Sequence, residues 1–319
     1  MKLALILLLS SVGILAGAQE TAAGLKMEGR VAFTEGPAWN AENGNVYFTD
    51  IENNRIMRRD PSGAFHVYRT PSGRANGLTF DKDGRLHACE GGREGGNFRV
   101  TRTERDGSIT VLTADFGGKK YNSPNDLCID SAGRIYFTDP RYGDKGNMQI
   151  EDADGKKVEG VYRIDPDGKV SQVLAHEVQR PNGVAVSSDG KFLFVADNWN
   201  DAPGGNRKLW RFDLKGDGVV DAASRKELFD WGNERGPDGM CVGPDGLLYV
   251  TAGLNFASDA ETATKFKAGV YVIDPKGGGK KNFYGVPEDM ITNCTFGGEK
   301  GRTLFITSGH KLWSLELPE

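Results

Sequence analysis

Six segments of the chain share one arrangement of apolar and polar positions. Each begins with an acidic or amide residue, continues through a short apolar run, turns at a glycine about eight residues on, and ends in a second apolar run. The six starts lie 41 to 57 residues apart, a spacing typical of four-stranded repeats joined by loops. The segments are EGPAWNAENGNVYFTD from Glu35, NGLTFDKDGRLHACE from Asn76, NDLCIDSAGRIYFTD from Asn125, NGVAVSSDGKFLFVAD from Asn182, DGMCVGPDGLLYVTA from Asp238 and NCTFGGEKGRTLFIT from Asn293.

A third and a fourth short run follow five of these segments. The third runs, such as GVYRIDPDG, alternate apolar and polar residues and end in Asp-Pro-x-Gly or similar turn signals. The sixth unit has only a third run, HKLWSLEL, so we expect residues 24–33 to return as its fourth strand. The sequence therefore predicts an all-β fold, a six-bladed β-propeller with four antiparallel strands per blade, closed by the N-terminal strand.

The first residue of each segment has a defined place in such a propeller. The first strand of a blade lines the central axis, so its opening residue lies at one face of the disc. The ends of the second strands reach the same face further out, at Asp50, Glu90, Asp139 and Asp197. We therefore expect a ring around one mouth of the channel, called the mouth ring below, which consists of Glu35, Asn76, Asn125, Asn182, Asp238 and Asn293.

The mouth ring has two interpretations. Asn and Asp are common at strand starts, where their side chains cap free backbone amides, and this explains any single position. Converging carboxylate and amide oxygens, without His or thiolate, instead suit a hard cation such as Ca²⁺ or Mg²⁺. A cation with open positions can polarise a carbonyl and lower the pKa of a bound water. A polar channel bridged by ordered water is the alternative to a metal.

Four motifs in this order resemble one known family. They are FTEGPAW with Glu35, SPNDL with Asn125, RPNGVAVS with Asn182 and GPDGMCVGPDG with Asp238. On these motifs the chain, from about residue 28 to 317, is identified as a member of the senescence marker protein (regucalcin)/gluconolactonase/luciferin-regenerating enzyme-like family. In that family these positions supply the metal site of a six-bladed propeller.

The resemblance implies a role for each motif residue. Glu35, Asn182 and Asp238 would be metal ligands, and Asn125 would bind either the metal or the substrate. Asp238 would also be the catalytic acid/base, or would hold the activating water. The implied cofactor is a divalent cation, with Ca²⁺ as the first choice and Zn²⁺ or Mg²⁺ as alternatives.

One position departs from the family pattern. Regucalcin-type members have a basic residue two positions before the residue that corresponds to Asn125, and this chain has Ser123 there. Residues of neighbouring loops could take its place at the substrate, namely Arg74, Arg93, Arg141 and Tyr142; we expect Arg141 and Tyr142 to join Asn125 in substrate binding. Two long loops, residues 197–208 and 254–269, are expected to rim the pocket.

The N-terminus has the composition of a targeting segment. MKLALILLLSSVGILAGAQE combines Lys2, an apolar stretch and a small-x-small site ending at Ala18, which is typical of a secretory signal peptide; an uncleaved anchor is the alternative. We therefore expect a signal peptide over residues 1–18 and a single propeller domain over residues 19–319. The mature protein would be secreted, or periplasmic in a Gram-negative bacterium, with no membrane attachment after cleavage.

Charge and cysteine content narrow the candidate partners. The net charge is −4 and no basic run occurs, which argues against nucleic acid as a partner. The four cysteines of an exported chain permit disulfides, but we favour buried free thiols, because equivalent positions of separate repeats need not lie within bonding distance. The sequence does not predict the oligomeric state.

The leading functional interpretation is a metal-dependent hydrolase that opens a sugar lactone, as a gluconolactonase does, or a similar cyclic ester. Its attacking water would be activated by the metal at the propeller mouth, and its partner would be a small-molecule lactone. A phosphotriesterase-type hydrolase would keep the metal and change the bond. A propeller that binds a carbohydrate or a protein without catalysis is the third interpretation. No GxSxG elbow or catalytic cysteine context offers a different nucleophile.

Overall fold

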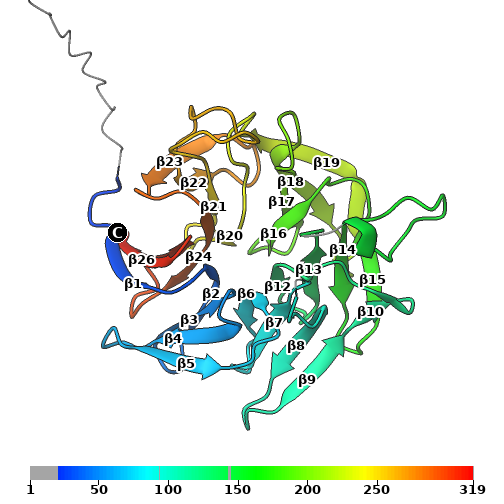
Figure 1. Ribbon diagram of the computed structural model, residues 1–319, viewed down its shortest axis with the longest axis horizontal. Coiled ribbons are helices and arrows are strands. Elements are labelled where there is room, and N and C mark those ends of the chain that lie inside the picture. The colour runs from blue at the N-terminus through cyan, green and yellow to red at the C-terminus, as the bar shows by residue number, and fades with distance from the viewer. Residues whose placement is uncertain (1–20, 93, 143–144, 319) are drawn as a thin grey trace, which may run out of the picture.

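The computed structural model of the protein describes residues 21–92, 94–142 and 145–318. Six four-stranded antiparallel sheets stand around one axis as the blades of a propeller (Figure 1), which confirms the predicted fold class. The described residues contain no α-helix and one 3₁₀ turn, η1 at Lys145–Asn147. Accordingly, no helix in the described ranges has the length and apolar character needed to span a membrane.

The first three blades follow one another along the chain, each with its first strand next to the axis. Blade one consists of β2 (Thr34–Asn40), β3 (Asn45–Asp50), β4 (Arg55–Arg59) and β5 (Phe65–Arg69). Blade two consists of β6 (Ala75–Phe80), β7 (Leu86–Glu90), β8 (Arg99–Thr103) and β9 (Ile109–Thr113). A two-stranded ribbon of β10 (Asp115–Phe116) and β11 (Lys119–Lys120) precedes blade three, which consists of β12 (Leu127–Ile129), β13 (Ile135–Asp139), β14 (Gly160–Ile164) and β15 (Val170–Leu174).

The other three blades complete the ring. Blade four consists of β16 (Pro181–Val186), β17 (Phe192–Asn198), β18 (Arg207–Leu214) and β19 (Val220–Asp230). Blade five consists of β20 (Met240–Val242), β21 (Leu248–Ala252), β22 (Gly269–Ile273) and β23 (Lys280–Gly285). Blade six consists of β24 (Ile291–Gly297), β25 (Thr303–Ser308), β26 (Lys311–Glu316) and, outermost, β1 (Lys26–Arg30).

Blade six joins the two ends of the described chain, as the sequence predicted. β1 pairs antiparallel with β26, with Lys26 opposite Ser314 and Arg30 opposite Lys311. Figure 1 shows both strands beside the C-terminus. Glu28 of β1 also binds the neighbouring blade, because its carboxylate lies 2.6 Å from the Arg59 guanidinium of β4. The closing strand therefore ties blade six to blade one as well as to its own sheet.

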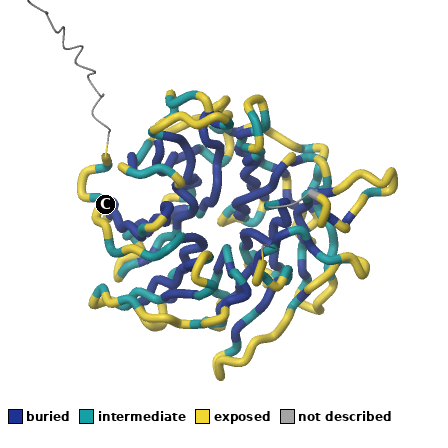
Figure 2. The backbone as a smooth tube through the Cα atoms, in the orientation of Figure 1, coloured by how far each residue is buried: buried dark blue, intermediate teal, exposed yellow. Residues whose placement is uncertain are grey.

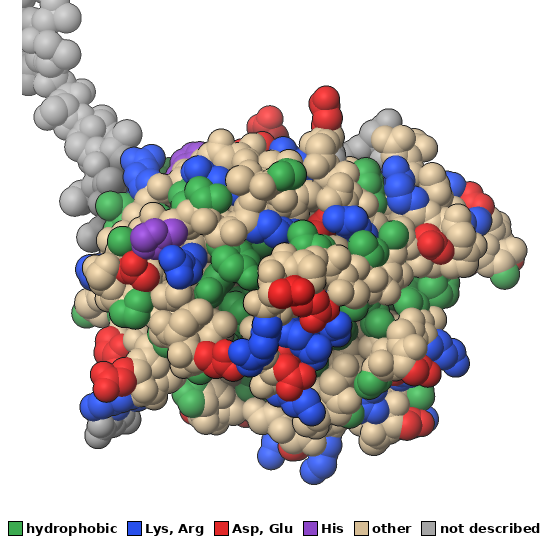
Figure 3. All heavy atoms as spheres, turned by 90° about the horizontal axis from the view of Figure 1, so that it is seen from below, with side chains coloured by type: hydrophobic (Ala, Val, Ile, Leu, Met, Phe, Trp, Pro, Cys, Tyr) green, Lys and Arg blue, Asp and Glu red, His purple; other side chains and the backbone are tan. Residues whose placement is uncertain are grey.

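The apolar core lies between neighbouring blades, and the outer strands form an exposed rim (Figure 2). All residues of β3 and β13 are buried, because a second strand has a blade against each of its faces. This explains why VYFTD and IYFTD lack the strict alternation of a half-exposed strand. On the side of the disc drawn in Figure 3, basic and acidic side chains are interspersed.

Glycines bring the inner strands together at the mouth. A Cβ on Gly183 would lie 2.5 Å from the Asp238 carbonyl oxygen of the next blade, and one on Gly239 would lie 2.0 Å from Asn293 Cγ. Backbone hydrogen bonds therefore link ring positions of successive blades directly: Gly77 N to Asn125 O at 2.7 Å, Gly183 N to Asp238 O at 2.8 Å, and Gly239 N to Thr292 O at 2.6 Å. The glycines that follow Glu35, Asn76, Asn182 and Asp238 thus allow neighbouring inner strands to approach closely at the mouth.

Candidate active site

A cavity of about 400 Å³ opens at the mouth of the channel, and it is called the mouth cavity below. The structure brings most of the mouth ring together in its lining, with Glu35, Asn76, Asn125 and Asp238. Thr292 of β24 also lines the cavity. Other lining residues come from the loops and strand ends above the ring, and include Phe33, Ile51, Arg74, Ser123, Arg141, Tyr142, Arg180, Asn198, Asn200, Asp201, Arg235 and Met290.

The sixth ring position is Thr292, which corrects the expectation of Asn293. Thr292 O accepts from Gly239 N, as Asp238 O accepts from Gly183 N in the preceding blade. The hairpin of blade six is longer on both sides of its turn. Counting back from the turn glycine, Gly301, therefore reaches Asn293, which is one residue further along the inner strand than Thr292. Asn293 instead corresponds to Asp126, and its Nδ2 donates to Asp126 Oδ2 across the axis at 3.2 Å.

The two ring carboxylates are buried and close enough to interact. Burial raises the pKa of Glu35 well above its ordinary value, and the charges of Asp238 and Asp126 raise it further. Burial also raises the pKa of Asp238, although the Arg235 guanidinium, 2.5 Å from Asp238 Oδ2, acts in the opposite direction. Two carboxylates that disfavour each other's ionised form are an arrangement that a nearby cation would stabilise.

The ring amides add oxygen donors to these carboxylates. The side-chain oxygens of Asn125 and Asn76 are buried and, among the described residues, have no hydrogen-bond partner. Asn182 lies beside the cavity, where its Nδ2 donates to Tyr142 Oη at 2.6 Å and leaves the amide oxygen as an acceptor. A buried acceptor without a donor is costly unless water or an ion satisfies it.

These donors fit a hard divalent cation, the cofactor that the sequence predicted. The described residues contain no group of three His, Cys, Asp or Glu side chains that could hold a metal. A cation at this place would therefore need amide ligands as well as carboxylates. Glu35 and Asp238 supply negative charge, and the unsatisfied oxygen of Asn125 supplies a neutral ligand. All-oxygen donor sets of this kind suit Ca²⁺ or Mg²⁺.

The acidic ends of the second strands support the ring from behind. Asp50, Asp139 and Asp197 are fully buried. Each accepts hydrogen bonds from two successive backbone amides just before an inner strand: Asp50 from Ala32 and Phe33, Asp139 from Asn122 and Ser123, and Asp197 from Gln179 and Arg180. These bonds fix the segments that carry Glu35, Asn125 and Asn182 into the mouth.

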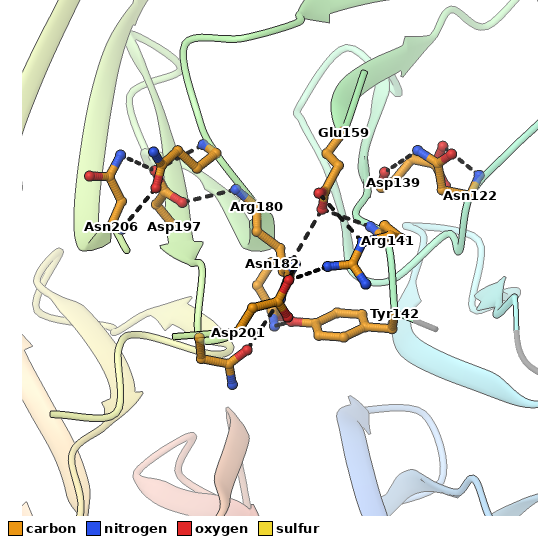
Figure 4. Close-up of polar contacts among 12 residues, drawn as sticks. Asn122, Asp139, Arg141, Tyr142, Glu159, Arg180, Asn182, Asp197, Asp201 and Asn206 are labelled. Atoms are coloured by element: carbon orange, nitrogen blue, oxygen red, sulfur yellow. Dashed lines mark hydrogen bonds and ion pairs between the residues drawn. The ribbon is translucent and has the colours of Figure 1, made fainter. Parts of the chain in front are cut away.

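Arg141 and Tyr142, the predicted substrate-binding pair, both line the mouth cavity. Arg141 forms an ion pair with Asp201, and its backbone N–H donates to Glu159 at 2.8 Å (Figure 4). Arg180 holds the same two acids, with Nη1 and Nη2 each 2.9 Å from an oxygen of Asp201. The Arg180 guanidinium also lies over the Tyr142 ring, 5.6 Å from its centroid, and so supports the tyrosine that contacts Asn182.

The position that departs from the family pattern is occupied by a small side chain. Ser123 lines the cavity, and its Oγ accepts from Gly92 N at 2.9 Å. Arg74 also lines the cavity, where its Nη2 lies 3.1 Å from Glu52 Oε2. Arg93 lies outside the described residues, as does the predicted signal peptide. Arg74 and other basic side chains from neighbouring loops therefore line the same cavity as Ser123.

The two long loops differ in their relation to the cavity. Asn198, Asn200 and Asp201 of the first loop line it, as expected. No described residue of the second loop does, so that expectation was wrong. The second loop lies one layer behind, with Glu261 Oε1 3.7 Å from Arg235 Nη1.

Two arginines of the site were missed by the sequence analysis. Arg180 and Arg235 are buried, and they precede Asn182 and Asp238 by two and three residues. The available signal was a basic residue directly before a ring motif, in RPNG and RGPDG. Blades four and five thus carry the basic residue that blade three lacks.

The fold and site define a class: a six-bladed propeller with an oxygen-lined cavity at the mouth of its channel. The family profile described as the SMP-30/gluconolactonase/LRE-like region matches residues 33–310, and the chain belongs to this family.

Individual relatives and solved structures agree with this assignment. A gluconolactonase of Zymomonas mobilis is 31% identical over 301 residues, covering 88% of this chain and 78% of the relative. A pentonolactonase of Haloferax volcanii is 26% identical over 280 residues, covering 86% and 80%. The solved gluconolactonase of Xanthomonas campestris has a TM-score of 0.75 at 29% identity, with 92% and 89% covered. A regucalcin of Agrobacterium tumefaciens, a calcium-binding protein, has a TM-score of 0.69 at 17% identity, with 92% and 93% covered, and is similar in fold.

Proposed function

We propose that the protein is a lactonase that hydrolyses a sugar lactone or a similar small cyclic ester at the mouth cavity. The observation that carries the proposal is the gathering of two buried carboxylates and an unsatisfied amide oxygen in one cavity of about 400 Å³. A cavity of this volume has room for a sugar lactone. The gluconolactonase and pentonolactonase relatives support the choice of substrate class.

Glu35, Asn182 and Asp238 would hold a divalent cation, with Asn125 as a fourth ligand or a substrate contact. When bound, this cation supplies positive charge that polarises the ester carbonyl and acidifies the attacking water. Ca²⁺ is the proposed metal, since every donor is an oxygen.

The chain's own residues hold and move the proton. Asp238 would accept the proton of the attacking water, because its carboxylate lines the cavity and its raised pKa makes it a stronger base. Attack on the ring carbonyl breaks the ester C–O bond, and the same proton can pass to the departing alkoxide. The product is the open hydroxy acid. Arg235 would hold Asp238 in position through the 2.5 Å contact.

The two sides of the cavity favour a substrate with a polar face. Blades three and four contribute Arg141, Tyr142, Arg180 and Asp201, which can bind hydroxyl groups. Blades one and six contribute Phe33, Ile51 and Met290, which can cover an apolar ring face. We therefore expect a hydroxylated lactone to be preferred over an unsubstituted one of the same ring size.

The test is a lactonase assay of purified protein after chelation and after return of Ca²⁺. Glucono-1,5-lactone, a pentonolactone and δ-valerolactone distinguish the substrate preference, and a phosphotriester is the comparison. Hydrolysis of the hydroxylated lactones that disappears on chelation and returns with Ca²⁺ is the expected result. Turnover of the phosphotriester alone would favour a phosphotriesterase, and no turnover of any compound would favour a binding propeller.

We also propose that residues 1–18 are removed as a signal peptide and that the mature enzyme works outside the cytoplasm, in the periplasm of a Gram-negative source. The support is the composition of the N-terminus.

A further inference from the structure

Cys241 and Cys294 lie opposite each other on neighbouring inner strands, β20 of blade five and β24 of blade six. Their Sγ atoms are 3.6 Å apart. Both thiols are free in the structure, as are Cys89 and Cys128. Free thiols were expected because equivalent positions of separate repeats need not lie within bonding distance. Cys241 is three residues after the ring residue Asp238, whereas Cys294 is two residues after Thr292, so these two positions are not equivalent, and their sulfurs meet.

The close approach follows from the backbone just before each cysteine. Gly239 N donates to Thr292 O at 2.6 Å, two residues before Cys241 and Cys294 respectively. Gly239 permits this hydrogen bond because it has no side chain. A Cβ at this position would lie 2.0 Å from Asn293 Cγ. Residues two apart on a strand point to the same face. Each cysteine therefore points to the same side of its strand as the residue that makes this contact.

The pair is also reachable. Cys241 is partly exposed, and both cysteines line a second cavity of about 220 Å³ along the channel, on the inner strands below the mouth ring. Cys294 is buried, and burial together with the neighbouring Cys241 raises its pKa well above the ordinary value. Cys241 is therefore the thiol that an external reagent meets first.

We propose that Cys241 and Cys294 are a redox pair whose disulfide staples blade five to the closing blade. A disulfide needs the sulfurs at about 2 Å, an approach that rotation of the two side chains can supply. The bond would form by two exchanges with a low-molecular-weight disulfide. Cys241 attacks one sulfur of the reagent, forms a mixed disulfide and releases one reagent thiol. Cys294 then attacks Sγ of Cys241 and releases the second, and each cysteine proton ends on a departing thiol.

The disulfide would stabilise blade six, the blade that closes the propeller. It encloses the chain between two residues 53 positions apart, which removes chain entropy from the unfolded state. For a loop and a protein of these sizes the expected rise in Tm is on the order of 5 °C.

The experiment treats the purified full chain with 2-hydroxyethyl disulfide, unfolds it in an alkylating agent, and measures intact mass, disulfide-linked peptides and Tm. We expect two thiols fewer to be alkylated, a linked peptide pair containing Cys241 and Cys294, and a Tm rise that dithiothreitol reverses. C241A should lose all three effects, whereas C89A, the matched control, should keep them.

Four alkylated thiols after treatment would overturn the proposal, and so would a linked pair that includes Cys89 or Cys128. A Cys241–Cys294 bond that leaves Tm unchanged or lower would overturn the stapling role. C294A serves as a second variant if C241A does not fold.

Discussion

Replacing Asp238 by Asn removes one charge beside the charged side chains of Arg235 and Glu35. The Asp238 carboxylate lies 2.5 Å from Arg235, raises the pKa of Glu35, and lines the mouth cavity. Asp238→Asn keeps the size of the side chain and one acceptor oxygen. It therefore tests the charge and basicity of this position separately from its shape.

The effect on catalysis should exceed the effect on stability. Loss of general-base assistance costs about 10²–10⁴-fold in rate, which equals about 3–5 kcal/mol of transition-state stabilisation. Breaking a buried ion pair by removing one partner costs about 3–5 kcal/mol of folding stability. Here Glu261 still lies 3.7 Å from Arg235, and Glu35 is relieved of a repelling charge. We therefore expect a stability loss at or below about 3 kcal/mol.

The assay measures kcat on glucono-1,5-lactone at saturating Ca²⁺ and urea unfolding of the same preparations. Glu261→Gln is the matched control, because Glu261 contacts the same guanidinium but does not line the mouth cavity. The control should lose stability and keep kcat within a few-fold of the unaltered protein. A folded Asp238→Asn variant that retains most of its turnover would refute the catalytic assignment and leave the ring as a structural cation site.

Four further predictions concern the metal, the closure, a buried histidine and export. Asn182→Ala should raise the Ca²⁺ concentration needed for half-maximal activity, with activity partly restored at high Ca²⁺; unchanged Ca²⁺ dependence would exclude it as a ligand. A chain that begins at Phe33 lacks β1 and exposes the edge of β26, so its cooperative thermal unfolding should be lost, and an unchanged Tm would contradict the closure. Burial lowers the pKa of His87 to about 4, whereas the unfolded chain takes up this proton near pH 6.5. The free energy of unfolding should therefore fall by up to about 3 kcal/mol as the pH drops from 6.5 to 4. In urea unfolding, His87→Gln should lose less of this free energy between pH 7 and pH 4.5 than the unaltered protein does, and an equal loss would speak against this cause. N-terminal sequencing of exported protein should begin near Gln19, whereas retained Met1 would contradict cleavage.

The fold was predictable because its information is local and repeated. Each hairpin carries its own turn glycine and apolar runs, and six copies correct the ambiguity of any one. The error at the sixth ring position also comes from relying on the repeat. Counting from Gly301 assumes equal hairpin lengths, whereas the register is set by inter-blade hydrogen bonds such as that from Gly239 to Thr292, which one sequence does not display.

The site was predictable only as far as it lies on the repeat. Glu35, Asn125 and Asp238 lie within two residues of the start of an inner strand, so the propeller geometry gathers them. The Arg180–Asp201 and Arg235–Glu261 contacts join the segment before an inner strand to a long loop, and loop conformation depends on partners that are distant in sequence. The acids that end the second strands were placed at the correct face, but their role as acceptors for the backbone before Asn125 and Asn182 depends on contacts between segments that the sequence alone does not reveal.

The pairing of β1 with β26 has a consequence for how the chain folds. Five blades are built from strands that are neighbours in sequence, so each can form as soon as its own segment is available. β1, the first strand of the described residues, can pair only after β26, the last one, is available, and this pairing spans nearly the whole described chain. Contacts of such long sequence separation form slowly, because the intervening chain must be ordered before they stabilise it. Until β1 pairs, the disc presents the bare edge of β26, and such an edge is open to strand exchange with a second molecule.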